Sequence, residues 1–526
     1  MKKHVRTSIL ILICFSVLTG ARPAWSEAVS LTKNNVWLMP VLKEGAVAWP
    51  CRVVVWFDKQ FLEDGGAYRR KTEEFAGWKR SDMRRRVVSD LKRLNDDAWS
   101  VAGTGIEGLV RQKKIDQVHR HWIINGFSCR VSNAGALKEL TAVPGVSKIF
   151  ARVDNVPIRA AAGEGSFYPA VSQTPFQPET VTFPWYAEKL GADRVWREFG
   201  VFGQQTITVI HDSNFVMTAG LTAGLYRKPG EIPANGKDDD GNGLADDVHG
   251  FNFDQGNANL TPLGDFGGTR DIGEPLHGFL CASIICGSGQ GDKPWVPGIA
   301  PRGQWAGVIG HGNIEDGVEW AAEIGADTYN MSFSLPGFGQ YRTHWRKIME
   351  QGAFCGLVFV SGAGNFARAG SRNYAPVPVQ MRVPEDIPDA VISAAGVRQD
   401  LVRPPFSSQG PVQWQTDYYR EGKVGKPDVV TFNTDLPVVM PDGVIRPQGV
   451  SGNSFAGAML SGAVALILSA DPDILPWDLR DIILDTAKDI DPFGFDYQTG
   501  HGLVDCHRAV QEVRQRKALP APAQAQ

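Results

Sequence analysis

The chain has 526 residues, 43% of them hydrophobic and 21% charged, which is ordinary for a globular protein. This length is too great for one small core and indicates two or three domains. A formal net charge of −3 gives no basis for nucleic acid or an anionic membrane surface as a partner.

The first residues have the pattern of a secretory signal peptide. Lys2 and Lys3 precede an apolar run over residues 9–18, and small residues follow around Ser26. Because the run is too short to span a bilayer, we assign residues 1–26 to a cleaved signal. The protein is therefore expected to be secreted or periplasmic, with no membrane span after signal cleavage.

Residues 27–157 are predicted to form a small α+β domain. The expected strands cover 52–57, 118–125, 126–131 and 146–153, and the expected helices cover 81–114 and 134–140. This succession of strand, helix, strand, strand, helix and strand is the ferredoxin-like pattern. The charge run Arg84-Arg85-Arg86 on the first helix is interpreted as a solvated face.

Cys14 falls in the predicted signal, and the other six of the seven cysteines follow it. In the ferredoxin-like order the first and third strands are antiparallel neighbours, which brings Cys51 towards Cys129. A disulfide between them and a pair of free buried thiols are both open alternatives. The cysteine spacing matches no zinc pattern, and no nearby pair of histidines completes one.

Residues 158–183 are rich in Pro, Ala, Ser and Gly and are predicted to be an exposed linker. Over residues 184–513 apolar strands alternate with helices, with strands expected at 206–210, 303–310, 328–334, 356–362 and 390–396. This alternation indicates an α/β fold, a three-layer parallel sheet with helices on both faces. Residues 514–526 are predicted to be a disordered tail.

The stretch from Ser451 to Ala470 is the most informative of this region. It is apolar on every side from Phe455 to Leu468, which predicts a buried helix. Its glycines and serines are unfavourable within a helix, so we expect neighbouring strands to approach it closely. Ser454 lies at its N-terminal end, either as a simple N-cap or where free backbone N–H groups favour a developing negative charge.

Three further polar residues are expected to gather near Ser454. Asp212 and Asn365 each follow a predicted strand, and His277 opens an apolar helix. Functional groups of parallel α/β sheets collect at the carboxyl ends of the strands. The set has the parts of an acyl-transfer site: a hydroxyl, an imidazole to take its proton, a carboxylate to orient the imidazole, and an amide donor.

These stretches resemble the subtilisin-like serine peptidases, or subtilases. The resemblance is carried by TITVIHDSNF, EPLHGFLCASIICG, VFVSGAGN and GNSFAGAMLSG, which follow the family's order over residues 184–513. It implies that Asp212 orients His277, that His277 is the general base and acid, and that Ser454 is the nucleophile. It further implies Asn365 and the backbone N–H of Ser454 as oxyanion donors, and substrate binding at Ser332, Phe333, Ser334 and Gly362.

The same resemblance implies that residues 27–157 are an inhibitory propeptide. The expected protein is a secreted serine endopeptidase, made as a self-processed precursor, whose partners are polypeptide substrates and its own propeptide. The alternative is a catalytically impaired homologue that acts as a secreted peptide-binding or calcium-dependent structural protein.

An acidic stretch between Asp212 and His277 indicates calcium. Oxygen-bearing side chains at alternate positions of a tight loop suit a hard cation, and subtilases often carry such a loop. The predicted ligands are Asp238, Asp240, Asn242, Leu244 through its carbonyl, and Asp246. A solvated acidic turn is the open alternative.

Overall fold

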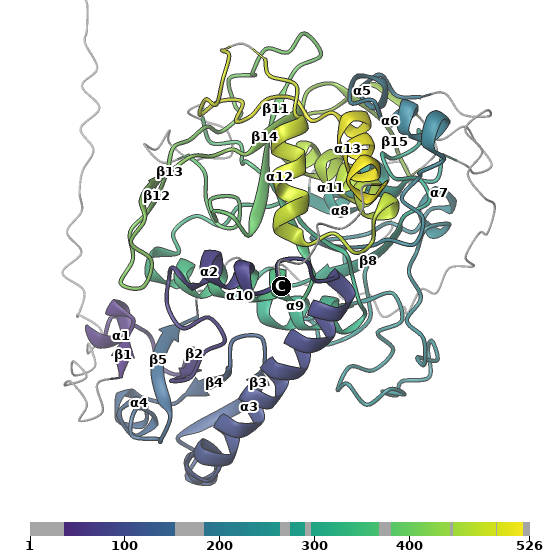
Figure 1. The fold of residues 1–526 in the computed structure, drawn as a ribbon. Helices are drawn as coiled ribbons and strands as arrows, with labels where there is room; N and C mark the ends of the chain where they lie inside the picture. The colour runs from purple at the N-terminus through teal and green to yellow at the C-terminus, as the bar shows by residue number, and fades with distance from the viewer. Residues whose placement is uncertain are drawn as a thin grey trace, which may run out of the picture.

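The computed structural model describes residues 36–152, 183–263, 274–289, 296–367, 380–441, 445–490 and 492–518. The predicted signal peptide, nearly all of the predicted linker and residues 519–526 lie outside this range. Within it the chain forms an N-terminal domain, residues 36–152, and a C-terminal domain, residues 183–518 (Figure 1).

The N-terminal domain is a five-stranded sheet packed on a long helix. Its strand order is β1-β5-β2-β4-β3. The strands are β1 (Trp37–Leu38), β2 (Cys51–Phe57), β3 (Ile115–His121), β4 (Gly126–Val131) and β5 (Val146–Ala151), and the helices are α1 (Pro40–Lys43), α2 (Ala67–Glu74), α3 (Arg80–Arg111) and α4 (Ala134–Leu140). Helix α3 buries Met83, Val87 and Leu91, which recur every fourth residue on one face.

The proposed disulfide is absent from this sheet. Strand β2 pairs antiparallel with β4, with Cys51 opposite Val131 and Cys129 opposite Val53. The two cysteines are therefore diagonal neighbours and are not bonded to each other. Diagonal Cα atoms are about 7–8 Å apart, beyond the usual reach of a disulfide.

The C-terminal domain confirms the predicted three-layer α/β fold. All paired strands of its main sheet are parallel, in the order β14-β11-β10-β9-β6-β8-β7. In that order the strands cover Val429–Phe432, Val391–Val397, Val358–Gly362, Thr328–Met331, Ile207–His211, Gln304–Ile309 and Gly250–Asn252. Two antiparallel ribbons flank it: β12 (Val412–Trp414) with β13 (Gly422–Val424), and β15 (Leu436–Val439) with β16 (Ile445–Val450).

Helices cover both faces of this sheet (Figure 1). They are α5 (Trp185–Lys189), α6 (Ala192–Arg194) with a π-turn over Val195–Phe199, α7 (Ala219–Thr222), α8 (Glu274–Cys286), α9 (Ile314–Glu323), a 3₁₀ turn over Gly339–Tyr341, α10 (Arg342–Phe354), α11 (Asn453–Ala470), α12 (Pro476–Thr486) and α13 (Cys506–Ala518). Helices α8 and α11 pack together on one face, while α9 and α10 pack together and also contact the N-terminal domain.

Helix α11 is the buried helix predicted from its composition. A Cβ atom on Gly457 would lie 2.6 Å from the backbone nitrogen of Gly362 in β10, so only glycine allows this approach. A Cβ on Gly462 would lie 2.5 Å from Cβ of Ile299. Close packing therefore outweighs helix propensity here. Among the described residues, α11 is the one helix long and apolar enough to cross a membrane, and 83% of it is buried inside the molecule.

Two predictions outside the main sheet were wrong for some of their residues, although Arg85 and Arg86 of the charge run are exposed as predicted. Helix α13 continues to Ala518, five residues into the predicted disordered tail. Its buried Val510 and Val513 hold one face on the core, and Arg516 pairs with Glu512 one turn earlier. Arg84 is not on a solvated face, because its guanidinium donates to the carbonyl oxygens of Cys355, Gly325 and Ala326 in the C-terminal domain.

Candidate active site

A strand end and the start of a helix place two of the predicted catalytic residues. Asp212 directly follows β6, at the carboxyl edge of the sheet, and is almost completely buried. His277 lies in the first turn of α8, and its Nδ1 is 2.8 Å from Oδ1 and 2.9 Å from Oδ2 of Asp212. The structure thus joins two residues that are 65 positions apart in the sequence.

The Asp212–His277 pair has strongly shifted acidities. Burial opposes charge on the His277 imidazole, but the neighbouring Asp212 carboxylate and Cys281 together more than offset it, so the pKa of His277 lies well above 6.5. Burial also works against the Asp212 carboxylate, yet His277 lowers the pKa of Asp212 below 3.8. With Nδ1 bound to Asp212, the imidazole keeps Nε2 for proton exchange.

Ser454 is the second residue of α11, and Gly452 occupies the N-cap position. Ser454 is therefore not the N-cap. Gly452 has φ 154°, a conformation that L side chains rarely adopt, and this turn brings the chain into the helix. The Ser454 hydroxyl donates to the carbonyl oxygen of Ser332 at 3.0 Å, and the Phe455 ring lies beside His277 with centroids 5.9 Å apart.

Asn365 lies in the loop after β10, next to the start of α11. Its Oδ1 accepts the backbone N–H of Asn453 at 2.9 Å, which orients the side-chain amide. A Cβ on Gly452 would lie 3.7 Å from its Nδ2, so the amide nitrogen is directed towards the turn that carries Ser454. The N–H of Ser454 is in the first helical turn, where N–H groups have no intrahelical acceptor.

The predicted substrate-binding residues line the same region. Ser332 follows β9, and its hydroxyl donates to the carbonyl oxygen of Ser454 at 2.9 Å. Phe333 packs on His311, with ring centroids 4.1 Å apart. Gly362 lies against the start of α11, and a Cβ there would lie 2.1 Å from the carbonyl oxygen of Asn453.

A buried carboxyl group that the sequence did not reveal lies beside these residues. Glu385 is fully buried, and its Oε1 accepts the Ser334 hydroxyl at 2.7 Å and the Arg382 N–H at 2.9 Å. Its Oε2 has no hydrogen-bond partner. Burial raises the pKa of Glu385 well above 4.5. Nothing in its loop sequence signals this placement, which depends on contacts with β9 and β10.

The acidic loop gathers only part of the predicted calcium ligand set. Asp238 and Asp240 lie with Glu231, which the sequence analysis missed, and their carboxylate oxygens are all within 4.8 Å of one another. Asn242 and Asp246 lie outside this group and accept backbone N–H groups of their own loop, from Leu244 and from Asn235. Glu231 lies outside the Asp-rich repeat, so no spacing rule pointed to it.

The site thus combines an Asp–His pair with a serine at the start of a buried helix, an arrangement that resembles that of hydrolases with a nucleophilic serine. Residues 251–502 match the model of the Subtilase family. This matched part of the chain is similar to that family. The match includes His277, Asn365 and Ser454.

Individual proteins are also similar to this chain. The chain is 29% identical over 198 residues to subtilisin DY of Bacillus licheniformis, covering 38% of this chain and 62% of that protein. It is 26% identical over 287 residues to a calcium-dependent protease of a Nostoc species, covering 47% and 40%. A solved structure of MycP1 with its N-terminal propeptide removed has 20% identity and a TM-score of 0.43, covering 63% of this chain and 98% of that one. The chain thus spans less than two thirds of these curated relatives.

Proposed function

We propose that the protein is a secreted serine endopeptidase, with Ser454 as nucleophile and His277 and Asp212 as its partners. The observation that carries this proposal is the double contact of His277 Nδ1 with the Asp212 carboxylate, at 2.8 and 2.9 Å. This contact fixes the tautomer in which Nε2 accepts a proton.

Catalysis begins with a rotation of the Ser454 side chain. Its hydroxyl, directed at the carbonyl oxygen of Ser332, turns towards Nε2 of His277 and attacks the peptide carbonyl carbon as the imidazole takes the proton. The imidazolium is stabilised by Asp212 and then gives the proton to the leaving amine. The Asn365 amide and the Ser454 N–H hold the negative oxygen. Water then releases the acyl group by the same steps in reverse order.

A fluorophosphonate probe tests this proposal directly, since it labels only an activated serine. We expect labelling of the mature protein at Ser454, and loss of labelling in Ser454→Ala. An unlabelled, folded wild-type protein would instead favour the impaired homologue that binds peptides without cleaving them.

We further propose that the N-terminal domain is the inhibitory propeptide. Its last described residue, Arg152, donates to Asn313 Oδ1 at 2.6 Å and to the carbonyl oxygen of Gly312. Gly312 follows His311, which packs on Phe333, one of the predicted substrate-binding residues. The chain therefore leaves the N-terminal domain beside the candidate active site. A tethered segment reaches the site at high effective concentration, which favours self-cleavage and inhibition by the product.

Asn365 is expected to act through its amide nitrogen. Asn365→Leu should lower kcat by about a hundredfold to a thousandfold with little change in KM, because one oxyanion donor is lost. Steady-state kinetics on a peptide substrate measures both constants. Asn365→Asp is the matched variant, because it keeps an oxygen to accept the Asn453 N–H. Recovery of kcat in Asn365→Asp would show that Asn365 only positions the start of α11.

Calcium binding at Glu231, Asp238 and Asp240 is the remaining part of the proposal. The residues fit such an ion because Glu231 Oε2 is buried without a hydrogen-bond partner and faces two exposed carboxylates. Lys228 also pairs with one oxygen each of Asp240 and Asp247, at 2.6 and 2.7 Å. Backbone carbonyls and water complete the shell of six to eight oxygens that calcium takes.

Adding calcium to the metal-free protein should raise its melting temperature. An ion that binds only the folded chain stabilises it by ~2.7 kcal/mol at a hundredfold excess over Kd. Calorimetry with and without calcium measures the shift, and Glu231→Gln should abolish it. An unchanged melting temperature of the wild type would mean that this loop is a solvated turn.

A further inference from the structure

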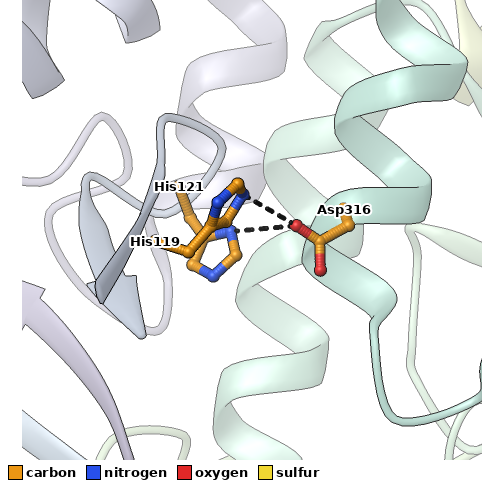
Figure 2. Close-up of side chains that lie close together, drawn as sticks. All are labelled: His119, His121 and Asp316. Atoms are coloured by element: carbon orange, nitrogen blue, oxygen red, sulfur yellow. Dashed lines mark ion pairs between the residues drawn. The ribbon is translucent and has the colours of Figure 1, made fainter. Parts of the chain in front are cut away.

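Two histidines of the N-terminal domain meet an aspartate of the C-terminal domain at the interface between them (Figure 2). His119 and His121 lie in β3, and Asp316 lies in the first turn of α9. His119 Nε2 is 3.0 Å and His121 Nδ1 is 3.7 Å from the same carboxylate oxygen, Oδ1 of Asp316. This cluster is separate from the candidate active site and from the acidic loop.

A bulge in β3 turns both histidines towards α9. Ile115 lies opposite Val131, while His119 lies opposite Ser128, so β3 has one residue more than β4 between these pairs. Val131 and Ser128 point to opposite faces of the sheet because they are an odd number of positions apart. Gln117, with φ +50°, marks the extra residue. The bulge therefore moves His119 and His121 from the domain's own core to the docking face.

His121 is held in the form that binds a metal through Nδ1. The residue is 1% exposed, and its Nε2 is 2.9 Å from the hydroxyl oxygen of Ser128. When Nε2 carries the proton and donates it to Ser128, Nδ1 presents a lone pair. That Nδ1 is buried and has no hydrogen-bond partner, and it is directed at Asp316. An unpaired buried nitrogen is costly unless something binds it.

We propose that His119, His121 and Asp316 bind a divalent transition-metal ion, with zinc the best match. Ligand atoms around a tetrahedral zinc lie roughly 3.3 Å apart when the bonds are about 2.0–2.1 Å long. The two distances to Asp316, 3.0 and 3.7 Å, bracket this separation, and all three ligand atoms lie within 4.8 Å of one another. Imidazole nitrogens favour zinc over calcium or magnesium. The His119 side chain is 62% exposed, which leaves a fourth position for water.

Two other charged residues, Arg152 and Glu315, lie near the cluster. Arg152, the nearby cation, has its guanidinium turned to Gly312 and Asn313. Glu315, next to Asp316 in α9, has its Oε1 2.6 Å from Nε2 of His344. Glu315 is not in the group of ligand atoms that lie within 4.8 Å of one another, and a guanidinium does not bind a cation. The competing explanation is a plain ion pair between protonated His119 and Asp316.

Zinc at this position would join the two domains. Two ligands come from β3 and one from α9, so the ion binds fully only when the domains are docked. Binding is therefore linked to docking by mass action. If the N-terminal domain is the propeptide, as proposed above, zinc would slow its release after cleavage.

The test uses the metal-free full chain carrying Ser454→Ala, so that cleavage cannot separate the domains. Cobalt is added as a probe, because cobalt in a tetrahedral nitrogen and oxygen site absorbs visible light, and zinc is then used to displace it. We expect one equivalent of each ion to bind and zinc to raise the melting temperature. No visible band and no saturable zinc binding would overturn the proposal and leave the ion pair.

Matched variants assign the ligands. His119→Gln changes an exposed ligand and should weaken zinc binding about a hundredfold or more. Lys92→Ala breaks the exposed Lys92–Glu323 pair between α3 and α9, 2.7 Å long, and should leave zinc binding unchanged. Glu231→Gln, in the acidic loop, should also leave it unchanged. Equal zinc affinity of His119→Gln and the parent chain would place any zinc elsewhere and refute the site.

Discussion

Ser454→Ala should lose peptide hydrolysis on the order of a millionfold in kcat, as expected when one member of a catalytic unit is removed. The substitution deletes only the oxygen that attacks the substrate. The fold should persist, because the lost contact is a single hydrogen bond to Ser332, and Ser332 still donates to the backbone carbonyl of residue 454. Active-site titration and steady-state kinetics on the same peptide measure the loss.

The same variant tests self-processing. The Ser454→Ala chain should accumulate with its N-terminal domain attached, whereas the wild type should yield a shorter form that begins between residues 154 and 183. Ser451→Ala is the control, because Ser451 is an exposed serine three residues earlier that accepts the N–H of Asp435. Normal processing of Ser454→Ala in a host that lacks other proteases would require a separate maturation enzyme.

Asp212→Asn should lower kcat by about ten-thousandfold near neutral pH. An asparagine donates an N–H to Nδ1 of His277, which forces the proton onto Nε2 and removes the base. It also removes the negative charge that stabilises the imidazolium. The measurement is kcat/KM across pH for both proteins.

The pH profile separates this role from a structural one. In the wild type His277 must be neutral to act as base, so kcat/KM should rise with pH through a pKa well above 6.5. Without the Asp212 charge, the effect of burial on the imidazole is offset less, and the pKa that governs the residual activity should fall. Ser213→Ala removes a 3.2 Å hydrogen bond to the same carboxylate and should keep the wild-type profile. An unshifted profile in Asp212→Asn would contradict the assignment.

Local patterns in the sequence predicted the framework of the C-terminal domain. Alternating apolar strands and helices predicted the parallel sheet, because the side-chain period of each element follows from backbone geometry. The uniform apolar character of residues 455–468 predicted a buried helix. The positions after the strands then predicted that Asp212 and Asn365 lie near Ser454, because the carboxyl ends of parallel strands share one edge.

Contacts between distant segments were decided only by the tertiary structure. Glu231 and Glu385 carry no local pattern, and they join their clusters through chain turns that the sequence does not specify. Arg84 reads as part of a surface charge run, yet it reaches carbonyl groups more than 240 positions away. Helix α13 extends beyond its predicted end, because packing of Val513 stabilises a segment whose own composition indicates disorder.

The proposed zinc site separates most clearly what the sequence determines from what only the tertiary structure determines. The sequence by itself determined that His119 and His121 are two positions apart, and hence on one side of any strand. The bulge at Gln117 decided which face of the sheet they occupy, and docking of the domains brought Asp316 to them from 195 positions away. Periodicity is encoded locally and can be read from a short window. Register shifts and domain contacts depend on the free energy of the whole fold, so only the folded chain determines them.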